Sequence, residues 1–177
     1  DISLSKRPMD RVLTPLKMMG AKLISSNNDK LPITIRGPKE VFPINYSSKI
    51  SSAQIKSSIL LSGLAASGRT IFKEPNESRN HTEKMLSSLG ANIHSKTLED
   101  GSYKVELGGN PVLRSGNINV PCDPSSAAFL VVAAVICPES KIELKNIMIN
   151  KGRDGLFKTL KEMGAKINIF NKKNNGG

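Results

Sequence analysis

A short helix-ending motif occurs three times in this chain. Its Gly-Ala steps are Gly20-Ala21, Gly90-Ala91 and Gly164-Ala165, separated by 70 and 74 residues. Before each glycine the apolar residues recur at helical spacing, and after it comes a short strand-like run. Glycine easily takes the left-handed conformation that ends a helix. Recurrence at this period predicts a chain built from repeated supersecondary units.

A second type of helix also recurs, over residues 52–61 and again over 125–132, about 73 residues on. Both segments open with serines, which are favoured as helix N-caps. Short strands are expected on either side of these helices, over residues 42–46 and 69–73 in one copy and 117–120 and 141–149 in the other. Further strands are expected directly after the Gly-Ala steps, at residues 22–24, 92–94 and 166–169.

The predicted unit is therefore strand, helix, strand, helix, strand, strand, and the fold class is α/β (α+β) with repeated βαβαββ units. Residues 39–109 hold one full copy, residues 1–37 the end of a previous copy, and residues 112–170 most of a third. Pro8 suits the first turn of the first helix. The chain starts without Met on residues 1–4, which resemble the tail of a strand, and it ends on a polar run. We therefore expect an internal fragment of a longer protein.

Composition limits the functional classes. Hydrophobic residues make up 38% of the chain and charged residues 23%, as in a globular protein. The longest apolar run, residues 127–137, has the length of a core helix rather than of a membrane span. Cys122 and Cys137 have no metal-binding spacing, and we expect buried free thiols in a reducing compartment.

The net charge of +11 is compatible with a nucleic acid, an anionic membrane surface or small anionic substrates. A bias toward lysine in the composition would also explain it. Only two tyrosines and five phenylalanines accompany the scattered basic residues. Single-stranded nucleic acid is bound by interleaved aromatic side chains, so nucleic acid is the weaker interpretation.

Three helix starts carry residues that suit an anion. Lys6-Arg7-Pro8 precedes the first helix, Ser51-Ser52-Ala53-Gln54 opens another, and Arg79 lies just before a third. Free N–H groups at a helix N-terminus favour phosphate. Each segment also has an ordinary explanation: a solvated basic turn at the first, capping by Ser52 at the second, and a polar loop at the third.

Other candidate residues are weaker. His81 could serve as a general base but suits a solvated or capping role, and His94 within a strand suits a structural one. The sequence contains no Ser-His-Asp arrangement, Walker loop, GxGxxG fingerprint or metal-ligand cluster. We therefore expect no metal site.

Four motifs in order carry a resemblance to a known family: Leu4-Ser5-Lys6-Arg7-Pro8-Met9, Ser52-Ala53-Gln54-Ile55-Lys56-Ser57, Glu74-Pro75 with Ser78-Arg79-Asn80-His81-Thr82-Glu83-Lys84-Met85-Leu86, and Asp123-Pro124-Ser125-Ser126-Ala127-Ala128-Phe129. The chain resembles the 5-enolpyruvylshikimate-3-phosphate synthases (3-phosphoshikimate 1-carboxyvinyltransferases). It is most similar to the bacterial subtype whose substrate loop reads Ser-Ala-Gln.

The resemblance implies a fold of two lobes, each made of three βαβαββ units. Residues 1–122 would be most of the lobe that binds shikimate 3-phosphate, and residues 123–177 would be a chain crossing and the start of the other lobe. The implied reaction moves the enolpyruvyl group of phosphoenolpyruvate to the 5-hydroxyl of shikimate 3-phosphate and releases phosphate. It uses no metal or organic cofactor. The implied partners are these two substrates, without nucleic acid or membrane, in a monomer of the bacterial cytoplasm.

The resemblance also assigns site residues. Arg7 matches an arginine that binds phosphoenolpyruvate, Ser52 and Ala53 match contacts to the shikimate phosphate, and Arg79 matches a contact to the shikimate ring. Gln54 matches a glutamine between both substrates. The family's Lys-Ser-Arg segment would lie before residue 1 and its acid/base Asp and Glu after residue 177. We therefore expect no catalytic residue within the chain and no turnover by the fragment alone.

Three other functions stay open. UDP-N-acetylglucosamine enolpyruvyl transferase shares the repeat, but it carries a cysteine upstream of its Arg-Pro motif, and neither Cys122 nor Cys137 lies there. A basic RNA-binding repeat module would show affinity that collapses with salt. The third alternative is a non-catalytic remnant, a chain that folds but has no activity.

Overall fold

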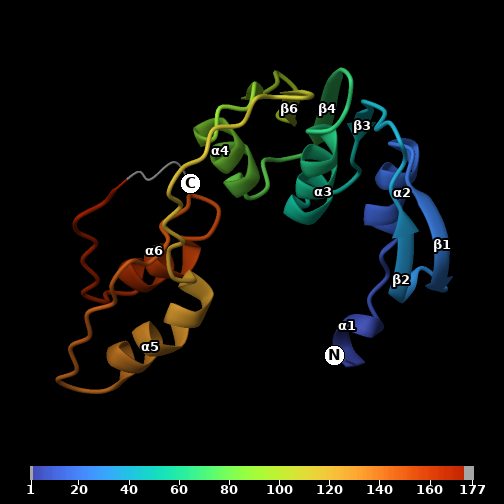
Figure 1. The fold of residues 1–177 in the computed structure, drawn as a ribbon. Coiled ribbons are helices and arrows are strands. Elements are labelled where there is room, and N and C mark those ends of the chain that lie inside the picture. The colour runs from blue at the N-terminus through green and yellow to red at the C-terminus, as the bar shows by residue number, and fades with distance from the viewer. Residues whose placement is uncertain (1, 174–177) are drawn as a thin grey trace. The chain divides into compact units, whose positions relative to one another are not determined.

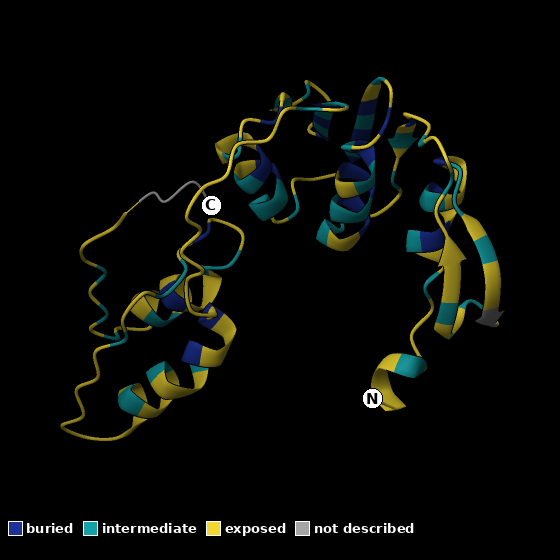
Figure 2. Ribbon diagram, viewed as in Figure 1, coloured by how far each residue is buried: buried dark blue, intermediate teal, exposed yellow. Residues whose placement is uncertain are grey.

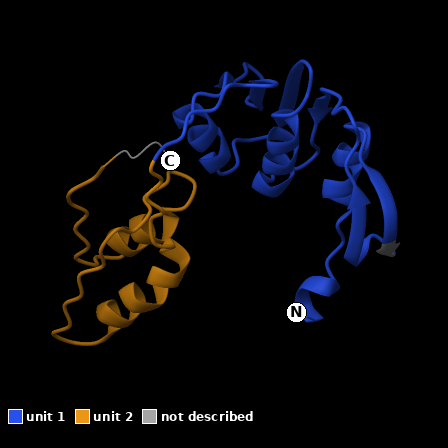
Figure 3. Ribbon diagram, in the orientation of Figure 1, with its two compact units in different colours: residues 1–116, 176–177 blue, residues 117–175 orange. Residues whose placement is uncertain are grey.

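The structure is a computed structural model that describes residues 2–173, apart from the side chains of residues 26 and 27 (Figure 1). The chain divides into two compact units between Gly116 and Asn117 (Figure 3). Unit 1 denotes the described residues up to 116, and unit 2 denotes residues 117–173. Each unit is described by itself.

Unit 1 contains the predicted full repeat. Its elements follow in the order β3 (Asn45–Ser47), α3 (Ala53–Gly63), β4 (Arg69–Glu74), α4 (His81–Ser88), β5 (Ile93–Thr97) and β6 (Tyr103–Gly108). The strands form one sheet in the order β3-β4-β6-β5, in which β3 and β4 are parallel and the other pairs antiparallel. The predicted βαβαββ unit is therefore confirmed here.

The core of this repeat lies between one face of the sheet and the helices α3 and α4. Burial alternates along β4 and β6, as expected for strands with one covered face. Figure 2 shows buried residues gathered on α3, α4 and β4. Two clusters make up this core, Leu60, Leu86, Ala91, Tyr103, Val105 and Leu107 in one, and Met19, Ile44, Ile55, Ile59 and Phe72 in the other.

The partial first copy has the predicted order of helix, strand, strand: α2 (Asp10–Met18), β1 (Lys22–Asn27) and β2 (Lys30–Arg36). Two details of the prediction are wrong. Residues 2–5 form the short helix α1 (Ile2–Ser5) and no strand, because local bonds such as Ser5 Oγ to Ile2 O (2.9 Å) satisfy this backbone. Pro8 precedes α2, because the Met9 N–H donates to Asp29 O (2.8 Å) and the helix begins after it.

Unit 2 holds two helices, α5 (Pro124–Ile136) and α6 (Gly155–Glu162). The strands predicted at 117–120, 141–149 and 166–169 do not form. A strand is defined by hydrogen bonds to a neighbour, and in the described part of unit 2 the only such pairing is an isolated bridge between Cys122 and Ile147. That bridge consists of the bonds from Cys122 N to Asn146 O (2.7 Å) and from Met148 N to Cys122 O (3.0 Å).

Two further expectations for unit 2 are corrected. Cys122 and Cys137 are free thiols as expected, but both are exposed, because the segments around them have no covering sheet. The N-cap of α5 is Asp123 and not a serine. Its carboxylate accepts from the Ser126 N–H (2.9 Å) and the Ser126 hydroxyl (3.0 Å), and so satisfies one amide of the first turn.

The close approach of Gly109 to Ala66 generates the first prediction. A Cβ atom at Gly109 would lie 1.9 Å from the Ala66 carbonyl oxygen. This oxygen belongs to the backbone, which cannot rotate aside as a flexible side chain can. We expect Gly109→Ala to lower the free energy of unfolding by about 1–3 kcal/mol, as overpacking usually does. Gly37→Ala is the matched control, because a Cβ there meets nothing within 4 Å. Urea unfolding of both variants tests this, and equal stabilities would contradict it.

Candidate anion-binding site

The start of α3 is the centre of the candidate site. Ser52 is the N-cap, and its Oγ accepts from the Ile55 N–H at 3.5 Å. The Ser52 N–H itself donates to Glu74 Oε2 (3.0 Å). The N–H groups of Ala53 and Gln54 belong to the first turn and so have no acceptor within the helix. They lie at the positive end of the helix dipole, where an anion is favoured.

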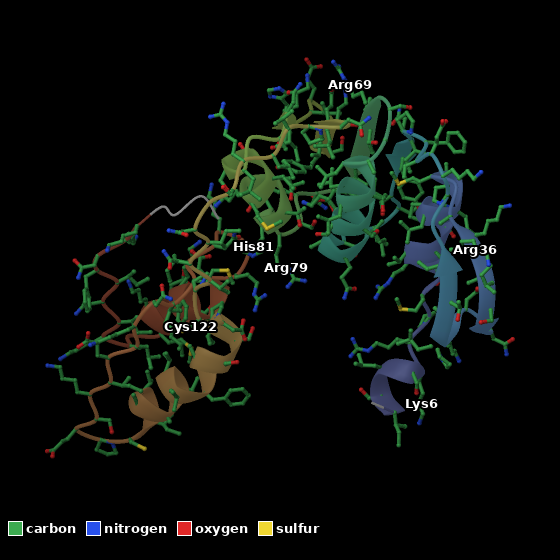
Figure 4. All side chains as sticks on the ribbon, in the orientation of Figure 1. Lys6, Arg36, Arg69, Arg79, His81 and Cys122 are labelled. Carbon is green, nitrogen blue, oxygen red and sulfur yellow. The ribbon has the colours of Figure 1, made fainter. Side chains whose placement is uncertain are left out.

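The loop that carries Arg79 is bonded to this helix start. The Ser51 hydroxyl donates to Asn76 O (2.8 Å) and accepts from Asn76 N–H (3.0 Å). Lys56 Nζ donates to the carbonyl of Ser78 (3.2 Å), the residue before Arg79. Arg79 is itself exposed, and its side chain extends away from the sheet (Figure 4). The structure thus brings the segments of Ser52 and Arg79 together.

A buried charge cluster lies beneath these two segments. Lys56 Nζ forms ion pairs with Glu74 (3.0 Å) and Glu83 (2.7 Å), and the side chains of Lys56 and Glu74 are fully buried. The same ammonium group lies 5.0 Å from the centre of the Tyr103 ring, a cation–π contact. Burial of Glu83 raises the pKa of its carboxyl above the ordinary 4.5, and the bond and charge of Lys56 offset this only in part.

The sequence motifs did not predict this charge cluster. A signal was present in the helical pattern, because Lys56 lies between Ile55 and Ile59 on the side of α3 that faces the core. A lysine at a core position of a helix requires a buried anionic partner. Two glutamates, Glu74 and Glu83, follow in the next strand and helix and supply it.

Gln54 connects the site to α2. Its Oε1 accepts from Arg11 Nη2 (3.2 Å), which makes Arg11 a further candidate that the sequence patterns did not single out. Arg7 lies between α1 and α2 with an exposed side chain. Among the described residues no hydrogen bond joins its side chain to Ser52, Gln54 or Arg79. The structure therefore brings four of the five candidates together, and links Arg7 to them only through α2.

The remaining sequence candidates contribute less. His81 is the first residue of α4 and half-buried, while His94 is exposed on β5. Residues 2–173 contain no group of three or more His, Cys, Asp or Glu side chains that could hold a metal ion. No helix in the same range is long and apolar enough to cross a membrane.

The third copy gives the contrast with the second. Arg153 precedes Gly164 by 11 residues, as Arg79 precedes Gly90. Its Nη2 pairs with Asp123 Oδ1 (2.8 Å) and donates to Ser125 Oγ (2.6 Å), so its charge is compensated. The pKa of Asp123 is lowered, first by the bond from the Ser126 amide. Among the described helix starts, the one of α3 combines a neutral serine cap with an uncompensated arginine nearby.

These features define a repeat-built α/β protein with a candidate site where helix-start amides and an exposed arginine lie close together. The sequence model of the protein family EPSP synthase (3-phosphoshikimate 1-carboxyvinyltransferase) matches residues 1–176 of the chain. The chain belongs to this family.

Individual relatives agree with this assignment. The 3-phosphoshikimate 1-carboxyvinyltransferases of Bartonella quintana and of a Chelativorans species are 48% and 49% identical to the whole chain. The solved EPSP synthase from Acinetobacter baumannii superposes on all of it with a TM-score of 0.82 and 41% identity. This chain spans about 40% of the length of these curated relatives and 39% of the solved chain.

The raised pKa of Glu83 predicts a pH dependence. Between the ordinary pKa of 4.5 and the higher value in the folded state, the folded protein holds a proton that the unfolded chain has released. The contribution of Glu83 to the free energy of unfolding therefore increases as the pH falls toward 4.5. We therefore expect the unfolding free energy of the wild type, minus that of Glu83→Gln, to rise as the pH is lowered toward 4.5.

Urea unfolding at a series of pH values measures this difference. Glu99→Gln is the control, because its exposed side chain has no ion pair among the described residues. If the difference in unfolding free energy between wild type and Glu83→Gln does not change with pH, or falls as the pH is lowered, then burial does not raise the pKa of Glu83.

Proposed function

We propose that the protein containing this chain transfers the enolpyruvyl group of phosphoenolpyruvate to the 5-hydroxyl of shikimate 3-phosphate. The observation that carries the proposal is the site at the start of α3, where four of the five residues with family roles lie on segments joined by hydrogen bonds. Membership of the EPSP synthase family supports the same conclusion. The reaction joins two multiply charged anions, so its main requirement is to hold them close together in the right orientation.

Each site residue has a role in this proposal. Ser52 and the N–H of Ala53 bind the phosphate of shikimate 3-phosphate at the positive end of α3. Arg79 contacts the shikimate ring and its hydroxyls. Gln54 lies between the substrates, where its bond from Arg11 orients the amide. Arg7 binds phosphoenolpyruvate, whose phosphate and carboxylate suit a guanidinium group.

The chemistry follows from this placement. The 5-hydroxyl group gives up its proton as its oxygen bonds to C2 of phosphoenolpyruvate. The methylene carbon of phosphoenolpyruvate gains a proton in the same addition, and this gives a tetrahedral intermediate. Loss of a proton from that carbon and of phosphate then forms the enolpyruvyl product. The groups that move these protons lie outside residues 1–177 in this proposal, and no metal or organic cofactor takes part.

The wider assignment is also a proposal. Residues 1–122 form most of the lobe that binds shikimate 3-phosphate, and residues 123–177 form a crossing and the start of the second lobe. The whole protein acts as a monomer in the bacterial cytoplasm. Its binding partners are its two substrates, and it binds neither nucleic acid nor membrane.

Calorimetric titration with shikimate 3-phosphate tests the site. We expect binding that requires the phosphate and weakens by about 10–100-fold in Arg79→Ala, because a bond to a charged group contributes about 1.5–3 kcal/mol. Arg36→Ala is the matched control, since Arg36 is an exposed arginine on β2. Unphosphorylated shikimate and a short RNA are the comparison ligands. Binding of RNA with steep salt dependence, or equal affinity for shikimate, would contradict the proposal.

A further inference from the structure

We propose that Glu74, paired with Lys56, is a positioning residue that sets the two halves of the shikimate 3-phosphate site relative to each other. This inference rests on the function proposed above. It concerns three side chains that are too buried to touch a substrate: Lys56 and Glu74 are 0% and 1% exposed, and Glu83 is 5% exposed. Their effect on the site must therefore pass through the segments that they hold.

Glu74 makes separate bonds to both segments. Its Oε2 accepts the N–H of Ser52, at the cap of α3 (3.0 Å). Its Oε1 accepts the N–H and the hydroxyl of Ser78, the residue before Arg79 (2.9 and 2.8 Å). One carboxylate at the end of β4 thus fixes the backbone on both sides of the site.

Lys56 completes the link from below. Its ammonium group pairs with Glu74 Oε1 and also donates to the carbonyl of Ser78 (3.2 Å). Its positive charge compensates the negative charge of the Glu74 carboxylate, which lies beneath a candidate site for anions. The second carboxyl, Glu83, contacts Lys56 from α4 (2.7 Å) but makes no bond to either segment among the described residues.

Stability alone does not explain such a cluster. Replacing buried ion pairs with apolar residues of similar volume is often neutral or stabilising. What apolar side chains could not supply is an acceptor for three donors from two segments. Ligand affinity depends on such preorganisation, because a site that is already ordered loses less entropy when the ligand binds.

Glu74→Gln is the decisive change. The amide keeps the shape of the side chain, but it offers one acceptor atom where the carboxylate offers two, and its NH₂ group opposes the N–H of Ser52 or Ser78. Glu83→Gln is the matched control, since it also removes a buried carboxylate beside Lys56 but leaves every bond of Glu74 in place. Both variants are made in the 177-residue chain.

The first measurement needs no ligand. Amide hydrogen exchange by NMR reports the opening of individual N–H groups. In Glu74→Gln we expect exchange at Ser52 and Ser78 to be faster by about 10-fold or more, the equivalent of about 1.4 kcal/mol, while the core amide of Val105 changes by less. In Glu83→Gln the amides of Ser52 and Ser78 keep their protection relative to Val105.

The second measurement is affinity for shikimate 3-phosphate, taken where each variant is fully folded. We expect the Kd to rise about 10-fold or more in Glu74→Gln and to change by less than about 3-fold in Glu83→Gln. A purely structural role would lower the unfolding free energy of both variants and leave the Kd of the folded molecules unchanged. That result would overturn the proposal, as would unaltered exchange at Ser52 and Ser78 in Glu74→Gln.

The two proposals fail in different ways. If the folded wild type does not bind shikimate 3-phosphate, the assigned function of the site is wrong, and the exchange data still decide whether Glu74 orders both segments. If Glu74→Gln does not fold, Ser78→Ala replaces it, because this change removes only the hydroxyl bond to Glu74. We then expect faster exchange at the amide of residue 78 and a higher Kd, and unchanged values in folded Ser78→Ala would overturn the positioning role.

Discussion

The buried ion pair between Lys56 and Glu74 is the constraint on which the rest of unit 1 depends. A fully buried ammonium group is tolerated only where charged and polar partners surround it. Here those partners come from β4, α4 and the loop between them, so that the position of α3 is fixed against all three. The Glu74 carboxylate also accepts the N–H of Ser52, the cap of α3. The requirement to compensate one charge in the core therefore also shapes the surface above it.

Much of the fold could be predicted from the sequence, because helical spacing and the glycine stops are local properties. The order of elements in residues 45–108 follows from them, and burial alternates along β4 and β6 as a sheet with one covered face requires. The absence of strands from the described part of unit 2 could not be predicted in this way. The run around Ile142 has the composition of a strand, but pairing is a property of two segments, and the described part of unit 2 supplies only the bridge at Cys122.

The residues of the candidate site also differ in whether local sequence signals could predict them. Ser52 and Arg79 could be found from the sequence, because capping serines and basic residues at helix starts are local signals. For the cluster beneath them the sequence holds only one signal, the core-facing position of Lys56 in the pattern of α3. A lysine in a helix is usually solvated, and only the tertiary structure shows Lys56 enclosed by Glu74 and Glu83, which come from different elements. The link between Gln54 and Arg11 is likewise a contact across 43 residues of sequence.

Comparison of the two repeat copies shows what makes one helix start available to an anion. In the third copy the cap of α5 is Asp123, whose carboxylate binds the Ser126 amide and pairs with Arg153. The cation is thereby compensated within the protein, and a negative charge already stands at the cap. In the second copy the cap is the neutral Ser52, and the carboxylate that serves this region, Glu74, lies behind the helix start with Lys56 as its counter-ion. The same scaffold is thus closed to an anion where the carboxylate stands at the cap, and open where it stands in the core.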